Sequence, residues 1–139
     1  MTGYGKRVLI VGHDEGERNV LGLMLENEGY NVHMASEEGL ALEELKRRRF
    51  DVVVSAHHMP QINGFRLALL GRLVWPDTPM IILSGNETSF PETTEQGAAY
   101  GSLRKPYVFS ELLELMENAI QVSCRHRSKI SQSTLSSSW

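Results

Sequence analysis

The sequence predicts an α/β fold in which helices cover both faces of a parallel sheet. Five short apolar runs alternate with segments of helical periodicity along the 139 residues. Three of these runs are rich in Val, Ile and Leu and lack polar alternation, which is typical of strands buried on both faces. Together these two observations predict a doubly wound sheet, with the functional loops at the carboxyl ends of the strands.

The five expected strands are short and are bounded by turn residues. They are Arg7–Val11, Asn31–Ala35, Asp51–Ser55, Met80–Ser84 and Gly101–Arg104. The loops that follow four of them contain residues 12–14, 55–58, 84–86 and 105–106. We expect these loops to meet at one edge of the sheet.

The first two helices have the clearest signals. The first is expected over 15–28, with a capping box made by Asp14 and Glu17. Its apolar stripe comprises Val20, Leu21, Met24 and Leu25. The second begins after Ser36 and ends in the basic run 46–49, which suits the negative end of a helix dipole. Its expected buried face comprises Leu40, Ala41 and Leu45.

Three more helices complete the predicted alternation. The third covers 64–74 and is stopped by Trp75-Pro76, while the fourth, over 91–99, has only a thin apolar stripe. The fifth starts after Ser110 and carries a strong apolar face. We therefore expect a single domain over residues 1–120.

The remaining residues, 121–139, differ in composition from this domain. They are rich in serine and have few periodic apolar residues, so we expect a disordered tail. All 17 acidic residues precede this tail, which carries the basic residues Arg125, Arg127 and Lys129. Because duplex binding draws on many contacts from Lys and Arg to phosphate, the acidic body predicts no direct nucleic-acid partner.

Several broad classes of protein are excluded by composition. No apolar run approaches the roughly 20 residues of a membrane span, and no signal-type segment precedes the first strand. We expect a cytoplasmic protein without a membrane partner. The single cysteine, Cys124, cannot form an intramolecular disulfide. No nucleophile elbow, P-loop or dinucleotide glycine fingerprint occurs, so we do not expect an enzyme.

Three segments resemble the receiver domain of two-component response regulators. They lie at 51–64, 81–85 and 104–107, and the resemblance covers about residues 6–120. It implies a flavodoxin-like, five-stranded parallel sheet with strand order 2-1-3-4-5. It also implies a role in phosphorelay signal transduction.

The resemblance fails at the residues that carry the family's chemistry. Family receivers have a phosphate-accepting aspartate where this chain has Ala56, and a Mg²⁺-binding acidic pair where it has Gly12 and His13. A methyl group can neither accept a phosphoryl group nor bind Mg²⁺. This interpretation requires that Ala56, and not Asp51, lies at the carboxyl edge. It predicts a pseudo-receiver with no catalytic residue and no cofactor.

Other family positions are retained. Ser84 and Lys105 match the residues that contact the phosphoryl group in family receivers, and Pro106 follows them. Each also has a plainer interpretation: Ser84 as a strand-end turn residue, Lys105 as a solvated lysine, and the Lys105-Pro106 pair as a turn.

With phosphorylation absent, the expected function is binding of a protein partner. Candidates are a histidine kinase, an output domain or another signalling protein, and a homodimer remains open. By resemblance, the contact face is formed by the fourth helix, fifth strand and fifth helix, and it includes Tyr100, Ser102, Tyr107 and Phe109. Ser102 stands where the family usually has an aromatic switch residue.

An alternative function uses histidine chemistry. His13, His57 and His58 follow strands that end at the same edge, and imidazoles bind Zn, Cu or Ni in preference to Mg. They could instead sense pH near neutrality. Side chains alternate across a strand end, so His57 and His58 should point to different sides. We therefore favour a purely structural role for these three histidines over a metal site.

Overall fold

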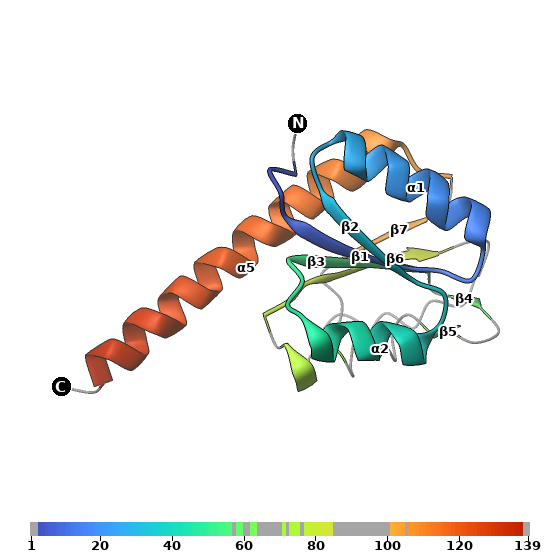
Figure 1. Ribbon diagram of the computed structural model, residues 1–139. Helices are drawn as coiled ribbons and strands as arrows, with labels where there is room; N and C mark the ends of the chain where they lie inside the picture. The colour runs from blue at the N-terminus through green and yellow to red at the C-terminus, as the bar shows by residue number, and fades with distance from the viewer. Residues whose placement is uncertain are drawn as a thin grey trace.

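A computed structural model describes residues 3–56, 58–59, 62–63, 71, 73–75, 77–84, 101–104 and 106–137. Five parallel strands form its central sheet, in the order β2-β1-β3-β6-β7 (Figure 1). Their bounds are Arg7–Val11 for β1, Asn31–Ala35 for β2, Val52–Ala56 for β3, Met80–Ser84 for β6 and Gly101–Arg104 for β7. Counted within the sheet, this is the order 2-1-3-4-5, which confirms the predicted fold class.

Helices cover both faces of this sheet. Helices α1 (Glu15–Asn27) and α5 (Phe109–Ser137) lie on one side, and α2 (Glu38–Arg47) lies on the other (Figure 1). Residues 71, 73 and 74 are helical, inside the span predicted for the third helix. The fourth predicted helix, over 91–99, lies outside the described residues. None of the helices within the described ranges is long and apolar enough to cross a membrane.

The alternation of side chains along the strands creates two apolar cores. In β1, Leu9 and Val11 face α2, whereas Val8 and Ile10 face α1 and α5. All four are buried, because each strand is covered on both sides. The continuous apolar runs in the sequence are a direct consequence of this arrangement.

Helix α1 is rotated relative to the predicted stripe. Gly22 and Leu25 are its buried residues, whereas Val20 is 59% exposed. A Cβ atom at Gly22 would meet the terminal methyl group of the flexible Met34 side chain on β2. In α2, Ala41 and Leu45 are buried as predicted, but Leu40 is 43% exposed.

The predicted disorder of residues 121–139 is wrong for most of that segment. Helix α5 continues without a break to Ser137 and projects well beyond the sheet (Figure 1). The segment contains neither Gly nor Pro, so its composition supplies no residue that would end a helix. Its first turn is also attached to the body, since the Ser123 hydroxyl donates a hydrogen bond to the Asp77 carbonyl oxygen.

The register of β3 places Ala56 at the carboxyl edge. Asp51 lies at the opposite, amino edge, where its Oδ2 accepts a hydrogen bond from the Arg7 backbone N–H at 2.8 Å. The Asp51 N–H in turn donates to the Arg7 carbonyl oxygen at 2.8 Å. Beyond β3, the short strands β4 (His58–Met59) and β5 (Ile62–Asn63) pair in antiparallel fashion, which the sequence analysis did not predict.

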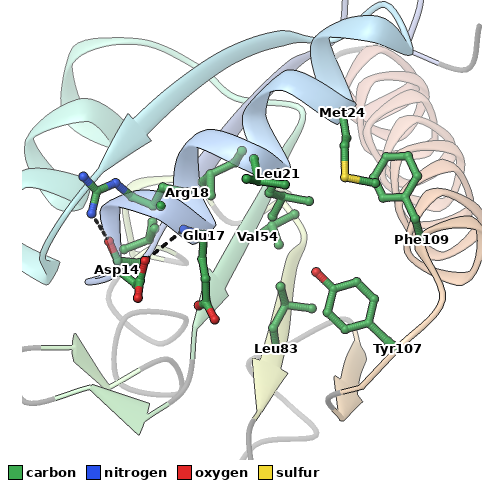
Figure 2. A pocket seen from close by; sticks show the side chains of 14 residues that line it. Asp14, Glu17, Arg18, Leu21, Met24, Val54, Leu83, Tyr107 and Phe109 are labelled. Carbon is green, nitrogen blue, oxygen red and sulfur yellow. Dashed lines mark hydrogen bonds between the residues drawn. The ribbon is translucent and has the colours of Figure 1, made fainter.

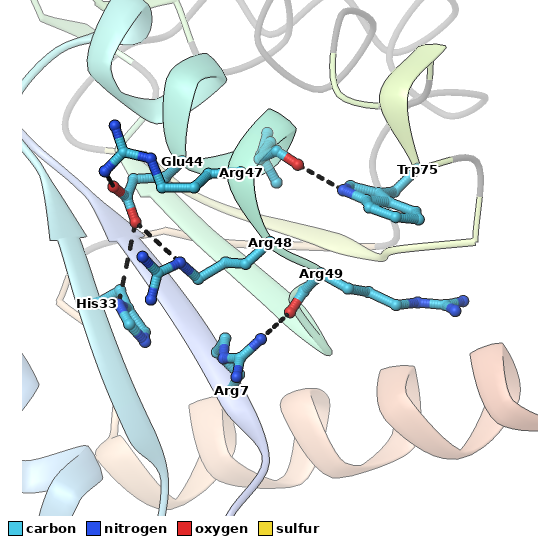
Figure 3. A network of polar contacts seen from close by, with 8 residues as sticks. Arg7, His33, Glu44, Arg47, Arg48, Arg49 and Trp75 are labelled. Atoms are coloured by element: carbon cyan, nitrogen blue, oxygen red, sulfur yellow. Dashed lines mark hydrogen bonds and ion pairs between the residues drawn. The ribbon is translucent and has the colours of Figure 1, made fainter.

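A polar network joins β2 to α2 near the amino edge (Figure 3). His33 Nδ1 lies 4.0 Å from Glu44 Oε1, and the same carboxylate lies 3.5 Å from Arg47 Nη1 and 3.6 Å from Arg48 Nε. The His33 ring packs edge-on against Phe50, with centroids 5.4 Å apart. Burial, followed by the positive charge of Arg48, lowers the pKa of His33, while Glu44 opposes this shift.

This lowered pKa predicts a specific dependence of stability on pH. The unfolded chain takes up a proton at His33 near pH 6.5, whereas the folded chain resists protonation at that pH. We therefore expect the free energy of unfolding to fall as pH drops below 6.5 toward the folded pKa. Urea titrations above and below pH 6.5 should show a smaller decrease in His33→Gln than in wild type. His13→Gln, which removes one exposed histidine, is the matched control. An identical pH dependence in wild type and His33→Gln would contradict the prediction.

Candidate functional site

The parallel register brings three predicted site residues to one edge of the sheet. Val11 is paired with Ser55, so Gly12 follows β1 beside the end of β3. Ala56, the last residue of β3, is paired with Leu83, and Ser84 is the next residue of β6. Gly12, Ala56 and Ser84 therefore occupy the carboxyl ends of three adjacent strands.

The loop between β1 and α1 is held by hydrogen bonds to its backbone. The Gly12 N–H donates to the Ala35 carbonyl oxygen at 3.0 Å. Arg18 Nη1 donates to the carbonyl oxygens of Gly12 at 2.6 Å and His13 at 3.0 Å. This role of Arg18 was not predicted, because a single basic residue in a first helical turn carries no specific signal.

Asp14 is the N-cap of α1, as predicted. Its Oδ1 accepts a hydrogen bond from the Glu17 backbone N–H at 2.9 Å. An N-cap side chain satisfies one of the otherwise unpaired amides at the start of a helix, which accounts for the position of this carboxylate. Asp14 thus has a structural role within the loop.

The residues that stand in place of the family's carboxylates are poor ligands for a hard cation. Gly12 has no side chain, His13 offers an exposed imidazole, and the Ala56 side chain is a methyl group. Mg²⁺ requires oxygen ligands in near-octahedral geometry, supplied mainly by carboxylates. The Asp14 carboxylate, in the same loop, accepts a hydrogen bond from the first turn of the helix. This donor set does not fit Mg²⁺.

A cavity of about 620 Å³ opens beside this edge, between α1 and the start of α5 (Figure 2). Its apolar walls come from both helices and from the strands β1, β3 and β6. The lining residues are Ile10, Val11, Gly12, Asp14, Gly16, Glu17, Arg18, Val20, Leu21, Met24, Val54, Leu83, Tyr107 and Phe109. This cavity was not predicted from the sequence, because its walls come from segments that are far apart in the chain.

Tyr107 and Phe109 lie on the α1 side of the β7–α5 junction. Both are predicted to belong to the partner face, and in the structure both are half-buried and pack against the core that contains Val54 and Leu83. Their rings cover the apolar ends of these strands, and the Tyr107 hydroxyl points toward the cavity (Figure 2). Burial, with a contribution from the negative charge of Glu17, raises the pKa of Tyr107.

The structure describes only some of the remaining predicted site residues. Ser102 is exposed on β7, and Pro106, two residues after the end of that strand, is also exposed. Lys105, Tyr100 and His57 lie outside the described residues, and His58 belongs to β4. Within the ranges that the structure covers, no cluster of three His, Cys, Asp or Glu side chains could hold a metal ion. The site that would use His57 and His58 with His13 stays untested.

Residues 8–117 match the response regulator receiver domain family. The chain belongs to this family. Its members are signalling modules of two-component systems, in which receiver domains interact with histidine kinases and output domains. The strand order and the helices on both faces agree with that membership.

Known relatives support the same assignment. The transcriptional regulatory protein GlrR of Escherichia coli is 33% identical over 119 residues, which cover 84% of this chain and 26% of GlrR. The two-component response regulator ARR10 of Arabidopsis thaliana is 32% identical over 130 residues, which cover 90% of this chain and 23% of ARR10. The chain therefore spans about a quarter of the length of these relatives.

Solved structures show the same fold. The crystal structure of an adenylate cyclase from Rhodopirellula baltica superposes with a TM-score of 0.85 and covers 94% of this chain and 98% of that chain. The two sequences are 24% identical, so this similarity concerns the fold alone.

Proposed function

We propose that this chain is a pseudo-receiver, which transmits signals by binding a protein partner and not by taking up a phosphoryl group. One observation carries the proposal: β3 ends at Ala56, at the sheet edge where family receivers have their phosphate-accepting aspartate. Formation of an acyl phosphate requires a carboxylate nucleophile, and alanine has none. The chain keeps the receiver fold around Ala56, but this residue cannot perform the family's reaction.

The loop after β1 supports the same proposal. Family receivers use an acidic pair there to bind Mg²⁺, which neutralises phosphate charge during transfer. Here Gly12 and His13 occupy those positions, and Arg18 binds both of their carbonyl oxygens. This guanidinium places positive charge beside the loop that carries the acidic pair in family receivers, and its hydrogen bonds stabilise that loop.

The proposed partners follow from the family and from α5. A histidine kinase, an output domain or another signalling protein would contact the exposed surface around Ser102, and a homodimer could use the same surface.

We place the globular unit at residues 1–120 and regard the rest of α5 as a connector to further chain. The named function of GlrR, transcriptional regulation, is one example of what such further chain could perform. The proposed setting is the cytoplasm, where a lone Cys124 would remain reduced.

Incubation with acetyl phosphate and Mg²⁺, followed by intact-mass spectrometry, tests this proposal. We expect wild-type protein to gain no phosphoryl group, because no carboxylate is available at position 56. Trapping with borohydride, which reduces acyl phosphates, makes the negative result secure. A phosphoryl adduct on the wild-type protein would refute the proposal.

A variant with restored carboxylates is the matched control. Ala56→Asp combined with Gly12→Asp and His13→Asp returns the nucleophile and the acidic pair to the family positions. We expect this triple variant to acquire a phosphoryl group that depends on Mg²⁺, while Ala56→Asn with the same pair does not. If only the triple variant takes up a phosphoryl group, the lack of uptake by the wild-type protein is due to the residues at positions 12, 13 and 56.

A further inference from the structure

We propose that a basic cluster at the end of α2 and the start of β1 binds an acidic segment of a protein partner. The cluster comprises Lys6, Arg7, Lys46, Arg47, Arg48 and Arg49. The inference rests on the proposed function only for the class of partner, a protein, and it names the chemistry that the partner would present. It assigns a surface near the amino edge of the sheet, opposite the carboxyl edge at which Ala56 lies.

The dipole of α2 accounts for only part of this cluster. Basic residues suit the negative end of a helix, but α2 ends at Arg47. Arg48 is the C-cap and has extended backbone angles, φ −153° and ψ 161°, and Arg49 follows it. Lys6 and Arg7 belong to a different segment, at the start of β1. Two separate segments therefore bring cations to the same place, which a helix dipole does not require.

Direct contacts hold these two segments together (Figure 3). Arg7 Nη1 donates a hydrogen bond to the Arg49 carbonyl oxygen at 2.9 Å. The Arg49 guanidinium lies over the Trp75 ring, 5.4 Å from the ring centroid. Both guanidinium groups are thus partly ordered before a partner binds, so less conformational entropy is lost on binding.

The carboxylate inside the cluster does not neutralise it. Glu44 lies 3.5 Å from Arg47 Nη1 and 3.6 Å from Arg48 Nε, so one negative charge faces two guanidinium groups. Lys46 and Arg49 are exposed, and neither forms an ion pair with another residue that the structure describes. These two cations can therefore pair with carboxylates of a partner without breaking an existing ion pair.

The rest of the domain has the opposite charge. The segments 6–7 and 43–51 carry six Lys and Arg residues against three acidic residues, Glu43, Glu44 and Asp51. The remainder of residues 1–120 carries five Lys and Arg residues against 14 Asp and Glu residues. Complementary charge steers the encounter of two proteins, and like charge suppresses wrong contacts. An acidic segment is therefore attracted to the cluster and repelled by the domain elsewhere.

A short acidic segment fits the cluster better than an extended polyanion does. A DNA duplex gains affinity from many contacts to phosphate, and the acidic remainder of the domain opposes such contacts. A segment with a few Asp or Glu residues needs to cover only the cluster. Four of the six cations are arginines, whose planar guanidinium groups form paired hydrogen bonds with carboxylates.

Titration of a capped hexaglutamate peptide into the full chain tests the proposal. Trp139→Phe leaves Trp75 as the single tryptophan, and the contact of Trp75 with Arg49 makes its fluorescence sensitive to binding at the cluster. We expect binding that weakens about tenfold as the ionic strength rises from about 0.01 M to about 0.15 M, because screening shortens the reach of charge. Hexaglutamine is the neutral control. Absence of hexaglutamate binding, or equal binding of hexaglutamine, would overturn the proposal.

Two variants and a control locate the site by heteronuclear NMR. Lys46→Gln combined with Arg49→Gln removes the two cations without an ion pair, and it should weaken hexaglutamate binding about fivefold. Arg49→Lys keeps the charge and should keep most of the affinity. Arg104→Gln removes an exposed cation from β7, outside the cluster, and should leave the affinity unchanged. Equal losses in the double variant and in Arg104→Gln would assign binding to net charge and overturn the site.

Two further probes separate the classes of partner. They are a short DNA duplex and vesicles of phosphatidylcholine with phosphatidylglycerol. We expect both to bind more weakly than hexaglutamate at physiological ionic strength, and tighter binding of either would overturn the assignment to a protein segment. These results are independent of phosphoryl uptake. A phosphoryl adduct on the wild-type protein would refute the proposed function, whereas a lack of peptide binding would refute this inference alone.

Discussion

Replacement of Phe50 by alanine is expected to lower the free energy of unfolding by about 3–5 kcal/mol. Phe50 is fully buried in the core between the sheet and α2, where Leu9, Leu45 and Val53 belong to the same cluster. It also packs edge-on against His33, with an interplanar angle of 84°. Truncation would remove this ring from a densely packed region and leave a cavity that backbone shifts can only partly fill.

Equilibrium denaturation in urea measures this effect. Leu40→Ala is the control, because Leu40 lies on the neighbouring helix α2 but is 43% exposed, and it should cost well under half as much. Domains of this size have a total stability of about 5–15 kcal/mol, so Phe50→Ala should shift the urea midpoint strongly. A change similar to that of Leu40→Ala would show that Phe50 is not a principal core residue.

The central strands β1, β3 and β6 were predictable from the sequence because one physical cause acts on nearly all of their residues. A strand buried on both faces must be apolar throughout, so runs such as Val52–Val54 could be located without knowledge of their neighbours. The structure confirms four of the five predicted strand spans residue for residue. The fifth, β3, is shifted by one residue to Val52–Ala56. The membership of Ala56 in this strand places it directly at the sheet edge.

The orientation of the helices depended on information that a local pattern does not contain. The apolar spacing in α1 includes both Val20 and Leu25, but only Leu25 is buried. In the structure Gly22 and Leu25 are the buried residues of α1, and this orientation depends on packing against other elements. The length of α5 was missed for a related reason, since low apolar content predicted disorder although nothing in the segment stops a helix.

The candidate site was predictable in part. Motif order located Gly12, Ala56 and Ser84, and the register brings their strands to one edge. The cavity was not predictable, because Leu21, Val54, Leu83 and Phe109 come from four separate elements. Each of them alone is an ordinary apolar core residue. Only the packing of α1 and α5 over the sheet shows that space remains between them.

Leu112→Ala is expected to lower the free energy of unfolding by about 2–5 kcal/mol, because it weakens the attachment of α5. Leu112, Met116, Ala119 and Ile120 are buried and follow the i, i+4, i+7, i+8 spacing of a single helix face. Leu112 is the first buried residue of this face, one turn after Phe109 at the cavity. Its loss should therefore affect both the global stability and the order of the cavity wall.

Urea denaturation and amide hydrogen exchange distinguish these two effects. Val122→Ala on the same helix is the control: Val122 is 49% exposed, and its replacement should change stability by less than about 0.5 kcal/mol. In Leu112→Ala, we expect exchange at 109–116 to accelerate more than exchange in β1, because local opening of α5 needs fewer contacts to break than global unfolding. Uniform acceleration would mean that α5 and the sheet unfold as one unit.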